Sequence, residues 1–181
     1  MKLSLAIFVA CSSLFAPSVS IAKSASPATP AAPLVCSGRG AKASQLAMAR
    51  KSPLFALLKS KMGEPTACKT TDSGTSFLVN FAQGGAFTMN VTPGIEYSEE
   101  EATFPTSGVT LSRDEAVVAL KNVANAMGAF PPPTIDWTQF EGPIPSGPVQ
   151  KELVDGDSCN FKVHINMDKG VVVAIGDSMA C

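Results

Sequence analysis

The sequence predicts an α+β fold, an antiparallel sheet of hairpins and meanders with two or three helices packed on one face and disulfides that stabilise it. Three observations support this fold class. Apolar residues alternate with other residues in the stretches 77–91 and 159–175, which is the period of a half-buried strand. In the stretches 41–62 and 112–127 they recur at helical spacing. The chain also begins with an export signal and carries cysteines beyond it, as disulfide-stabilised domains do.

The stretch 1–22 is typical of a secretory signal peptide. Lys2 precedes an apolar run at 3–10, and small residues at Ser20 and Ala22 fit a signal-peptidase site. We therefore expect cleavage near Ala22 and a mature protein that is periplasmic or secreted.

Two alternatives use the same segment differently. A lipoprotein signal would place a lipid on Cys11, but Phe8 stands where such signals usually carry Leu. An uncleaved anchor would need about 20 clean apolar residues, and Pro17 interrupts the run. Export with cleavage fits the residues better, so we expect no transmembrane segment in the mature form.

The mature chain has the length of one domain. A leader rich in Ala, Pro and Ser at 23–33 is expected to be flexible, and a single α+β domain is expected at 34–181. Because the two hairpin stretches align with each other, the domain is alternatively a pair of α-β-β-β repeats at about 34–104 and 110–181.

The stretch 41–62 is rich in residues that favour helices, and a Ser-Pro pair interrupts it. Ser52 suits an N-cap and Pro53 suits the first helical position, so a helix is expected to start at Pro53. Gly63 and Pro65 close it. Its predicted inner face consists of Leu54, Phe55, Leu58 and Met62.

The next helix has a stronger start signal. Ser112 and Glu115 form a capping-box pattern, in which each side chain bonds to the backbone of the other residue. Gly128 and the prolines at 131–133 end the helix. Its predicted apolar stripe consists of Val117, Leu120, Ala124 and Met127.

Two hairpins are expected from the alternating stretches. The first turns at 83–85, and its predicted inner residues are Phe77, Val79, Phe81, Phe87, Met89 and Val91. The second turns at 168–170, and its predicted inner residues are Cys159, Phe161, Val163, Ile165, Met167, Val171, Val173 and Ile175. A further strand at 149–154 would join it through the favoured turn Asp155-Gly156.

Removal of the signal peptide takes away Cys11 and leaves an even number of cysteines, which we expect to be paired as disulfides. Among the three connectivities we favour Cys36 with Cys68, which closes the basic helical segment, and Cys159 with Cys181, which ties the last residue to a strand. A redox or metal site is disfavoured because no Cys-x-x-Cys occurs and the chain has 1 His. No metal and no cofactor are expected.

Charge is unevenly distributed although the net charge is −1. Residues 23–70 contain eight basic residues and one acidic residue, whereas residues 71–181 contain five basic and fourteen acidic residues. The basic helices either pack near the acidic part, or they form a face for an anionic partner. Nucleic acid is not expected as a partner, because the predicted compartment is wrong and aromatic residues do not interleave the basic ones.

The densest acidic run contains Glu96 and the stretch 99–101. We interpret it as a solvated loop or as an edge strand guarded by charge. A contact surface for a basic partner is the alternative. A calcium loop would need Asp or Asn alternating with Gly, and that pattern is absent.

Two Gly-Asp-Ser blocks, at 156–158 and 176–178, invite comparison with esterases that carry a serine nucleophile in such a block. That chemistry needs a sharp strand-to-helix turn and a downstream His. Ser178 is almost at the end of the chain, and His164 precedes it. We interpret both blocks as turns or strand ends, place His164 on the solvated face of its strand, and predict no catalytic residue.

The candidate binding residues are two aromatic and two basic side chains. Trp137 and Phe140 lie in a Pro-rich stretch, where they either anchor a partner or fold back over the edge of the core. Lys59 and Lys61 belong to the basic helical segment.

Together these patterns predict an exported non-enzymatic binding protein that contacts another macromolecule, a protein partner, in an inhibitor, immunity or envelope-accessory role. The alternatives are a small exported hydrolase that uses paired carboxylates and a structural factor for envelope assembly. The hydrolase would lose turnover when one or two Asp or Glu residues are replaced, whereas the binding protein would lose affinity alone.

Overall fold

The predicted helices and hairpins are present in the structure, a computed structural model that describes residues 33–40, 43–71, 75–92, 97–126, 135–142, 149–155 and 160–180. The helices in these ranges are α1 (Ala43–Ala49), α2 (Pro53–Met62), α3 (Arg113–Ala126) and the 3₁₀ helix η1 (Trp137–Phe140). The strands are β1 (Pro65–Thr70), β2 (Ser76–Phe81), β3 (Ala86–Thr92), β4 (Tyr97–Thr103), β5 (Val149–Asp155), β6 (Asn160–Asp168) and β7 (Val171–Ala180).

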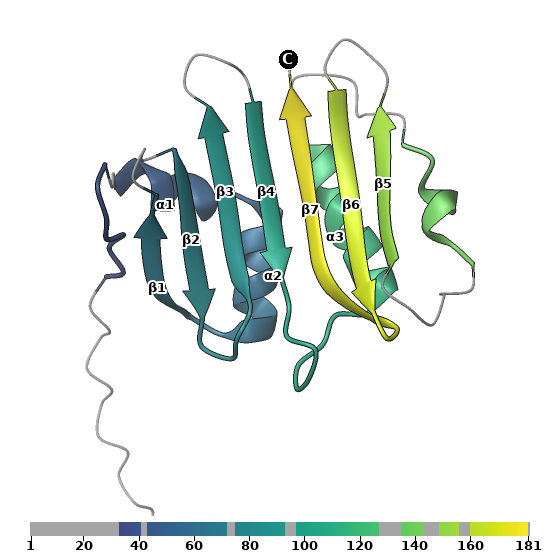
Figure 1. The fold of residues 1–181 in the computed structure, drawn as a ribbon, viewed down its shortest axis with the longest axis horizontal. Coiled ribbons are helices and arrows are strands. Elements are labelled where there is room, and N and C mark those ends of the chain that lie inside the picture. The colour runs from purple at the N-terminus through teal and green to yellow at the C-terminus, as the bar shows by residue number, and fades with distance from the viewer. Residues whose placement is uncertain are drawn as a thin grey trace, which may run out of the picture. The chain divides into compact units, whose positions relative to one another are not determined.

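All of these strands form a single antiparallel sheet of seven in the order β1-β2-β3-β4-β7-β6-β5. The helices α2 and α3 lie against one face of it, and Figure 1 views the sheet from the other face. The predicted fold class, a disulfide-stabilised α+β domain with helices on one side of an antiparallel sheet, is confirmed. β4 lies at the centre, so chain segments from both halves of the sequence meet on it.

The core lies between the helices and the sheet. α2 begins as predicted, because the Ser52 hydroxyl accepts hydrogen bonds from the amides of Leu54 and Phe55 and Pro53 occupies the first turn. Phe55 contacts the edges of Phe81 and Phe87 across the interface, with ring centroids 5.3 and 5.5 Å apart. The largest fully buried side chains are Phe77, Phe87, Leu54, Leu58, Met62, Leu111, Leu120, Ile175, Val79, Val163 and Val172.

The capping box at the start of α3 is also confirmed. The Ser112 amide donates to Glu115 Oε2 at 3.0 Å, and the Glu115 amide donates to the Ser112 hydroxyl at 3.3 Å. Lys61, in the last turn of α2, forms an ion pair with the same carboxylate. The hydrogen bonds from Lys61 and Ser112 lower the pKa of Glu115 to about 2. These contacts fix the end of α2 beside the start of α3.

Only part of the apolar stripe predicted for α3 is buried. Leu120 and Ala124 are buried as expected, but Val117 is only half-buried, and Met127 lies outside the described residues. Three of the five side chains that face the core are alanines, and the five are Ala116, Ala119, Leu120, Val123 and Ala124. Small residues allow α3 to lie close to the sheet.

A β-bulge changes the inner face of β7 from the predicted one. Val171 and Val173 were expected inside but are only half-buried, and Val172 is fully buried instead, whereas Ile175 is fully buried as expected. The register between β6 and β7 shifts between Asn166 and Met167, so β7 carries one extra residue at this point. An extra residue reverses the alternation of side chains on one side of the bulge.

The turn between β6 and β7 forms as predicted from Asp168-Lys169-Gly170. Lys169 and Gly170 both have positive φ, 49° and 81°, which is the geometry of a type I′ hairpin. The strand predicted at 149–154 is β5, which pairs with β6. The Asp155-Gly156 turn expected between them lies partly outside the described residues.

Two strands, β1 and β4, are not predicted by the sequence. The acidic run at 99–101 is neither a loop nor an edge strand, because β4 is paired on both sides, with β3 and with β7. Backbone pairing with two neighbours overrides the low strand propensity of glutamate. Because successive side chains of a strand point to opposite faces of the sheet, one of these glutamates faces the core.

The Cys36–Cys68 disulfide is present, with an S–S distance of 1.94 Å, and it joins the segment before α1 to β1. The pair predicted between Cys159 and Cys181 lies outside the described residues. The region proposed as a first repeat holds the four strands β1–β4 and the second holds β5–β7, and duplication stays a prediction. Within the described ranges, none of the helices combines the length and apolarity needed to cross a bilayer.

Candidate functional site

Two acidic side chains lie next to each other beneath the helices, at the centre of the sheet. Glu100 on β4 and Asp177 on β7 are directly opposite in the antiparallel register. On either side of them in the same row stand Met89 of β3 and Val163 of β6, both buried. Asp177 is only 3% exposed, and paired residues on neighbouring strands bring their side chains within reach of each other.

The start of α2 is linked to this pair through Ser52. The Ser52 hydroxyl accepts from the Leu54 amide at 3.1 Å and donates to Glu100 Oε2. The N-cap of the helix is thereby also the hydrogen-bond donor to a partly buried carboxyl. Asp177 lacks such a donor at one oxygen, because its Oδ1 is buried without a hydrogen-bond partner in the described structure.

Burial and mutual repulsion both disfavour the charged forms of these groups. Burial raises the pKa of Asp177 well above its usual value, and the negative charges of Glu100 and Glu99 raise it further. Burial also raises the pKa of Glu100, while the hydrogen bond from Ser52 acts in the opposite direction. The two carboxyls therefore favour a state in which they retain a proton, as carboxyl pairs in other proteins do.

A cavity of about 300 Å³ opens above the two acids, and we call it the carboxyl pocket. It lies between the end of α1 and the start of α2 on one side and the end of α3 on the other. The pocket opens to solvent beside Met48, which is 43% exposed, and Lys51. Its lining residues are Met48, Lys51, Ser52, Pro53, Met89, Val91, Ser98, Glu100, Val123, Ala126 and Asp177.

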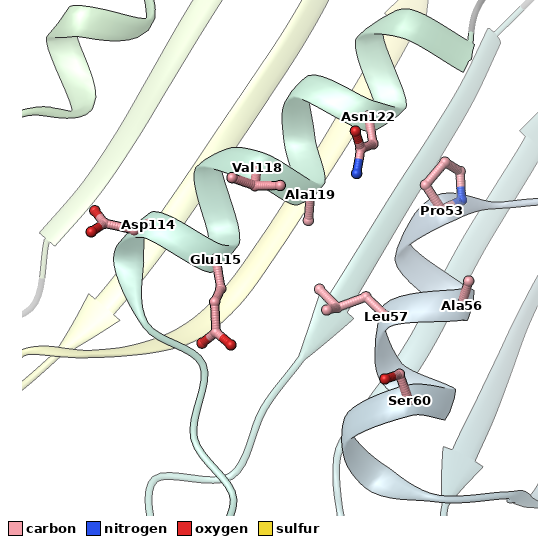
Figure 2. A pocket seen from close by; sticks show the side chains of 9 residues that line it. All are labelled: Pro53, Ala56, Leu57, Ser60, Asp114, Glu115, Val118, Ala119 and Asn122. Carbon is pink, nitrogen blue, oxygen red and sulfur yellow. The ribbon is translucent and has the colours of Figure 1, made fainter.

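A larger cavity of about 580 Å³, the helix groove, lies between α2 and α3. In Figure 2, Leu57 of α2 and Ala119 and Asn122 of α3 point toward the space between the helices, and the Asp114 carboxylate points away from it. The full lining is Pro53, Ala56, Leu57, Ser60, Asp114, Glu115, Val118, Ala119 and Asn122. Since Pro53 lines both cavities, the helix groove adjoins the carboxyl pocket.

The predicted basic residues of α2 are both in ion pairs. Lys59 Nζ lies 3.1 Å from a carboxylate oxygen of Glu64, and Lys61 pairs with Glu115 as described above. Lys61 therefore connects α2 to α3. The binding role proposed for these two lysines stays a prediction.

The predicted aromatic residues occupy the edge of the core. Phe140 is 6% exposed, and Trp137 packs against the core cluster with its ring centroid 6.1 Å from that of Phe140. Lys121 of α3 places its ammonium 5.7 Å from the Trp137 ring centroid. This is the folded-back arrangement that the sequence left open, and a role of the pair in binding stays a prediction.

On the sheet face opposite the helices, His164 of β6 reaches across β7 to Glu101 of β4, with 3.1 Å between Nε2 and Oε2. Gly176 lies between them in the register, and a Cβ there would be 2.5 Å from His164 Cε1. The predicted surface position of His164 is thus partly covered, since its side chain is 19% exposed. The glycine is required for the imidazole to lie over the strand.

Sequence reasoning missed both acids of the pair. The 176–178 block was interpreted as a turn or strand end, whereas it lies inside β7. Asp177 has the same parity as the buried Ile175, and Glu100 has the same parity as the buried Ala102 and Phe104. That alternation was the available signal, although a carboxylate rarely faces a core.

The chain has no match among known protein families, curated proteins or solved structures. Among the residues that the structure describes, no cluster of three or more His, Cys, Asp or Glu side chains is arranged to hold a metal ion.

Proposed function

We propose that this chain is an exported, non-enzymatic binding protein that acts through contacts with another protein. The observation that carries the proposal is the helix groove, whose walls are mainly apolar or small and which is open to solvent. Val118 on its wall is 57% exposed, the largest exposure among the large hydrophobic residues described on the helices. Grooves of this kind between helices are typical of protein and ligand interaction sites.

The charge of the surroundings indicates which partner fits. Glu100 and Asp177 line the adjoining carboxyl pocket, and Asp114 and Glu115 line the helix groove itself. Lys61 offsets Glu115, and Arg113 Nε lies 3.8 Å from Asp114 Oδ1, so among these four acids of the described structure only the carboxyl pair has no ion pair. A partner segment with apolar side chains and at least one positive charge is complementary to this surface.

Export is part of the proposal. The signal-like segment at 1–22 supports it, and the Cys36–Cys68 disulfide is consistent with an oxidising compartment. A binding protein in such a compartment gains durability from the covalent link.

The test is affinity capture from the envelope and culture fluid of the native host, with the protein tagged in the leader at 23–33. Val118→Asp places a charge in the helix groove, and Val109→Asp makes the same change at a surface position outside it that is 37% exposed. We expect one stoichiometric protein that the unchanged chain and Val109→Asp retain and Val118→Asp loses. Equal capture by all three, or no capture, would contradict the proposal.

The carboxyl pair favours a second candidate, a small exported hydrolase. One carboxyl that keeps its proton could act as a general acid while its neighbour acts as a base. In that case Glu100→Gln and Asp177→Asn would each abolish turnover in a screen of glycoside and ester substrates and leave the fold intact. Turnover that survives either substitution would exclude this candidate.

A further inference from the structure

We propose, on the basis of the function proposed above, that the carboxyl pocket receives the ammonium group of a lysine side chain that the partner inserts beside the helix groove. The site would thus select partners by one buried lysine.

The first step concerns hydrogen bonding. Asp177 Oδ1 is buried and has no hydrogen-bond partner in the described part of the chain, whereas Glu100 Oε2 already accepts from Ser52. A buried acceptor without a donor destabilises a protein, and Asp177 lines the carboxyl pocket, so rotation of its carboxyl would let this oxygen accept from a donor that enters the pocket. An ammonium group has three N–H donors and no acceptor, which suits a pocket lined by two carboxyls.

The second step concerns charge. The two carboxyls repel each other, and Glu99 adds to the repulsion that Asp177 experiences. A monovalent cation in contact with both removes that repulsion and favours their ionised forms. Lys51 also lines the pocket, but it is exposed, and the described structure contains no ion pair between it and either acid. Lys51 therefore does not neutralise either acid by direct contact.

The third step concerns shape. The walls between the pocket mouth and the acids are apolar and suit the methylene stem of a lysine. The wall residues are Met48, Pro53, Met89, Val91, Val123 and Ala126. Because the helix groove continues from Pro53, the rest of a longer chain has a surface to lie on, which favours a side chain of a protein over a free amine. An ammonium is a compact point charge with freely rotating donors and can contact two carboxyls at once, whereas a guanidinium presents five donors in a rigid plane.

The direct test uses the whole protein and a small probe, Nα-acetyl-lysine methylamide, titrated by NMR on the methyl groups of Met48 and Met89. The uncharged analogue Nα-acetyl-norleucine methylamide has a similar stem and is the matched control. We expect saturable shifts with the lysine probe alone and binding at least about tenfold weaker in Asp177→Asn and Glu100→Gln. Asp168→Asn, in the turn between β6 and β7 and outside the lining of both cavities, should bind as the unchanged protein does.

A second readout separates contact with the acids from a nonspecific surface effect. Binding of the cation should lower the pKa of the Asp177 and Glu100 carboxyls, followed by their 13C shifts as the pH is varied. Unchanged titration at saturating probe, or equal binding of the norleucine analogue, would overturn the proposal. If Nα-acetyl-arginine methylamide binds as tightly as the lysine probe or more tightly, the choice of lysine is overturned.

The capture experiment distinguishes the failure of this inference from that of the proposed function. If the partner is captured equally by Asp177→Asn and by the unchanged protein, the pocket has no role in binding while the proposed function stands. If capture is abolished both by acetylation of the partner's lysines and by Asp177→Asn, the proposed function and the lysine inference are both supported. If n-butylammonium binds as tightly as the lysine probe and no partner is captured, the pocket is a site for free amines and both are wrong.

Discussion

The buried carboxyl of Asp177 makes the stability of this protein depend on pH. Its pKa is higher in the folded state than in the unfolded chain, so the folded state binds the proton more tightly. The stability from this group is complete below the unfolded pKa, near 4, and is lost as the pH rises toward the folded pKa. Asp177→Asn removes this loss. We expect a gain of about 1–3 kcal/mol in the free energy of unfolding at pH 8 and almost none at pH 4.

Urea unfolding at pH 4, 6 and 8 measures this effect. Asp168→Asn, in the hairpin turn between β6 and β7, is the matched control and should change stability by less than about 0.5 kcal/mol at each pH. A gain from Asp177→Asn that is the same at all three pH values would show that the carboxyl does not titrate as its burial requires.

Gly176 is surrounded so closely that no larger residue fits at this position. A methyl group there would clash with the Glu100 carbonyl oxygen and would lie 2.5 Å from His164 Cε1. We expect Gly176→Ala to lower the free energy of unfolding by about 2–3 kcal/mol, because packed backbone cannot move aside. Ser178→Ala, on the same strand and the same face, should have little effect. Thermal unfolding compares the two, and adding His164→Ala to Gly176→Ala should recover only the part of the loss that the ring causes.

At the scale of the elements, the two helix caps have the same chemistry but different connections. Ser52→Ala and Ser112→Ala each remove an N-cap and should each lower stability by about 1 kcal/mol. Only Ser52 also donates to Glu100, so only Ser52→Ala should raise the pKa of that carboxyl, since the hydrogen bond lowers it.

The readout for the caps is the 13C titration of the Glu100 carboxyl in the unchanged protein and in both variants. In urea unfolding Ser52→Ala should be the less stable variant, because Glu100 also loses its donor, and only Ser52→Ala should shift this titration. A pKa of Glu100 that does not move in Ser52→Ala would mean that the hydroxyl hydrogen bond does not stabilise the carboxylate.

The elements that the sequence predicted are those with local signals. The Ser-Pro start of α2, the capping box of α3 and the Asp168–Gly170 turn are each set by residues within one turn of each other. The place of β4 in the sheet depends instead on its pairing with β7, a segment far along the chain, and local alternation does not specify that partner. The bulge in β7 likewise arises between two strands. Long-range pairing therefore also hid the carboxyl pair, which exists only when β4 and β7 meet.

At the scale of the whole molecule, the uneven charge is partly resolved by contact between the halves. Lys61 from the basic segment pairs with Glu115 from the acidic one, as the interpretation of mutual packing requires. The acids at the centre of the sheet receive no such partner from the described part of the basic segment.

The disulfide framework gives the prediction that covers the entire chain. Cys36 and Cys68 are separated by 32 residues, and closing a loop of that size contributes about 4 kcal/mol in the chain-entropy model. We expect Cys36→Ser with Cys68→Ser to lower the free energy of unfolding by about 3–4 kcal/mol, a large part of the 5–15 kcal/mol typical of a domain. Thiol titration of the mature protein in denaturant without reductant should find no free thiol, because Cys159 and Cys181 are predicted to pair as well. Two free thiols would leave Cys36–Cys68 as the only bond, and four would remove the basis for placing the protein in an oxidising compartment.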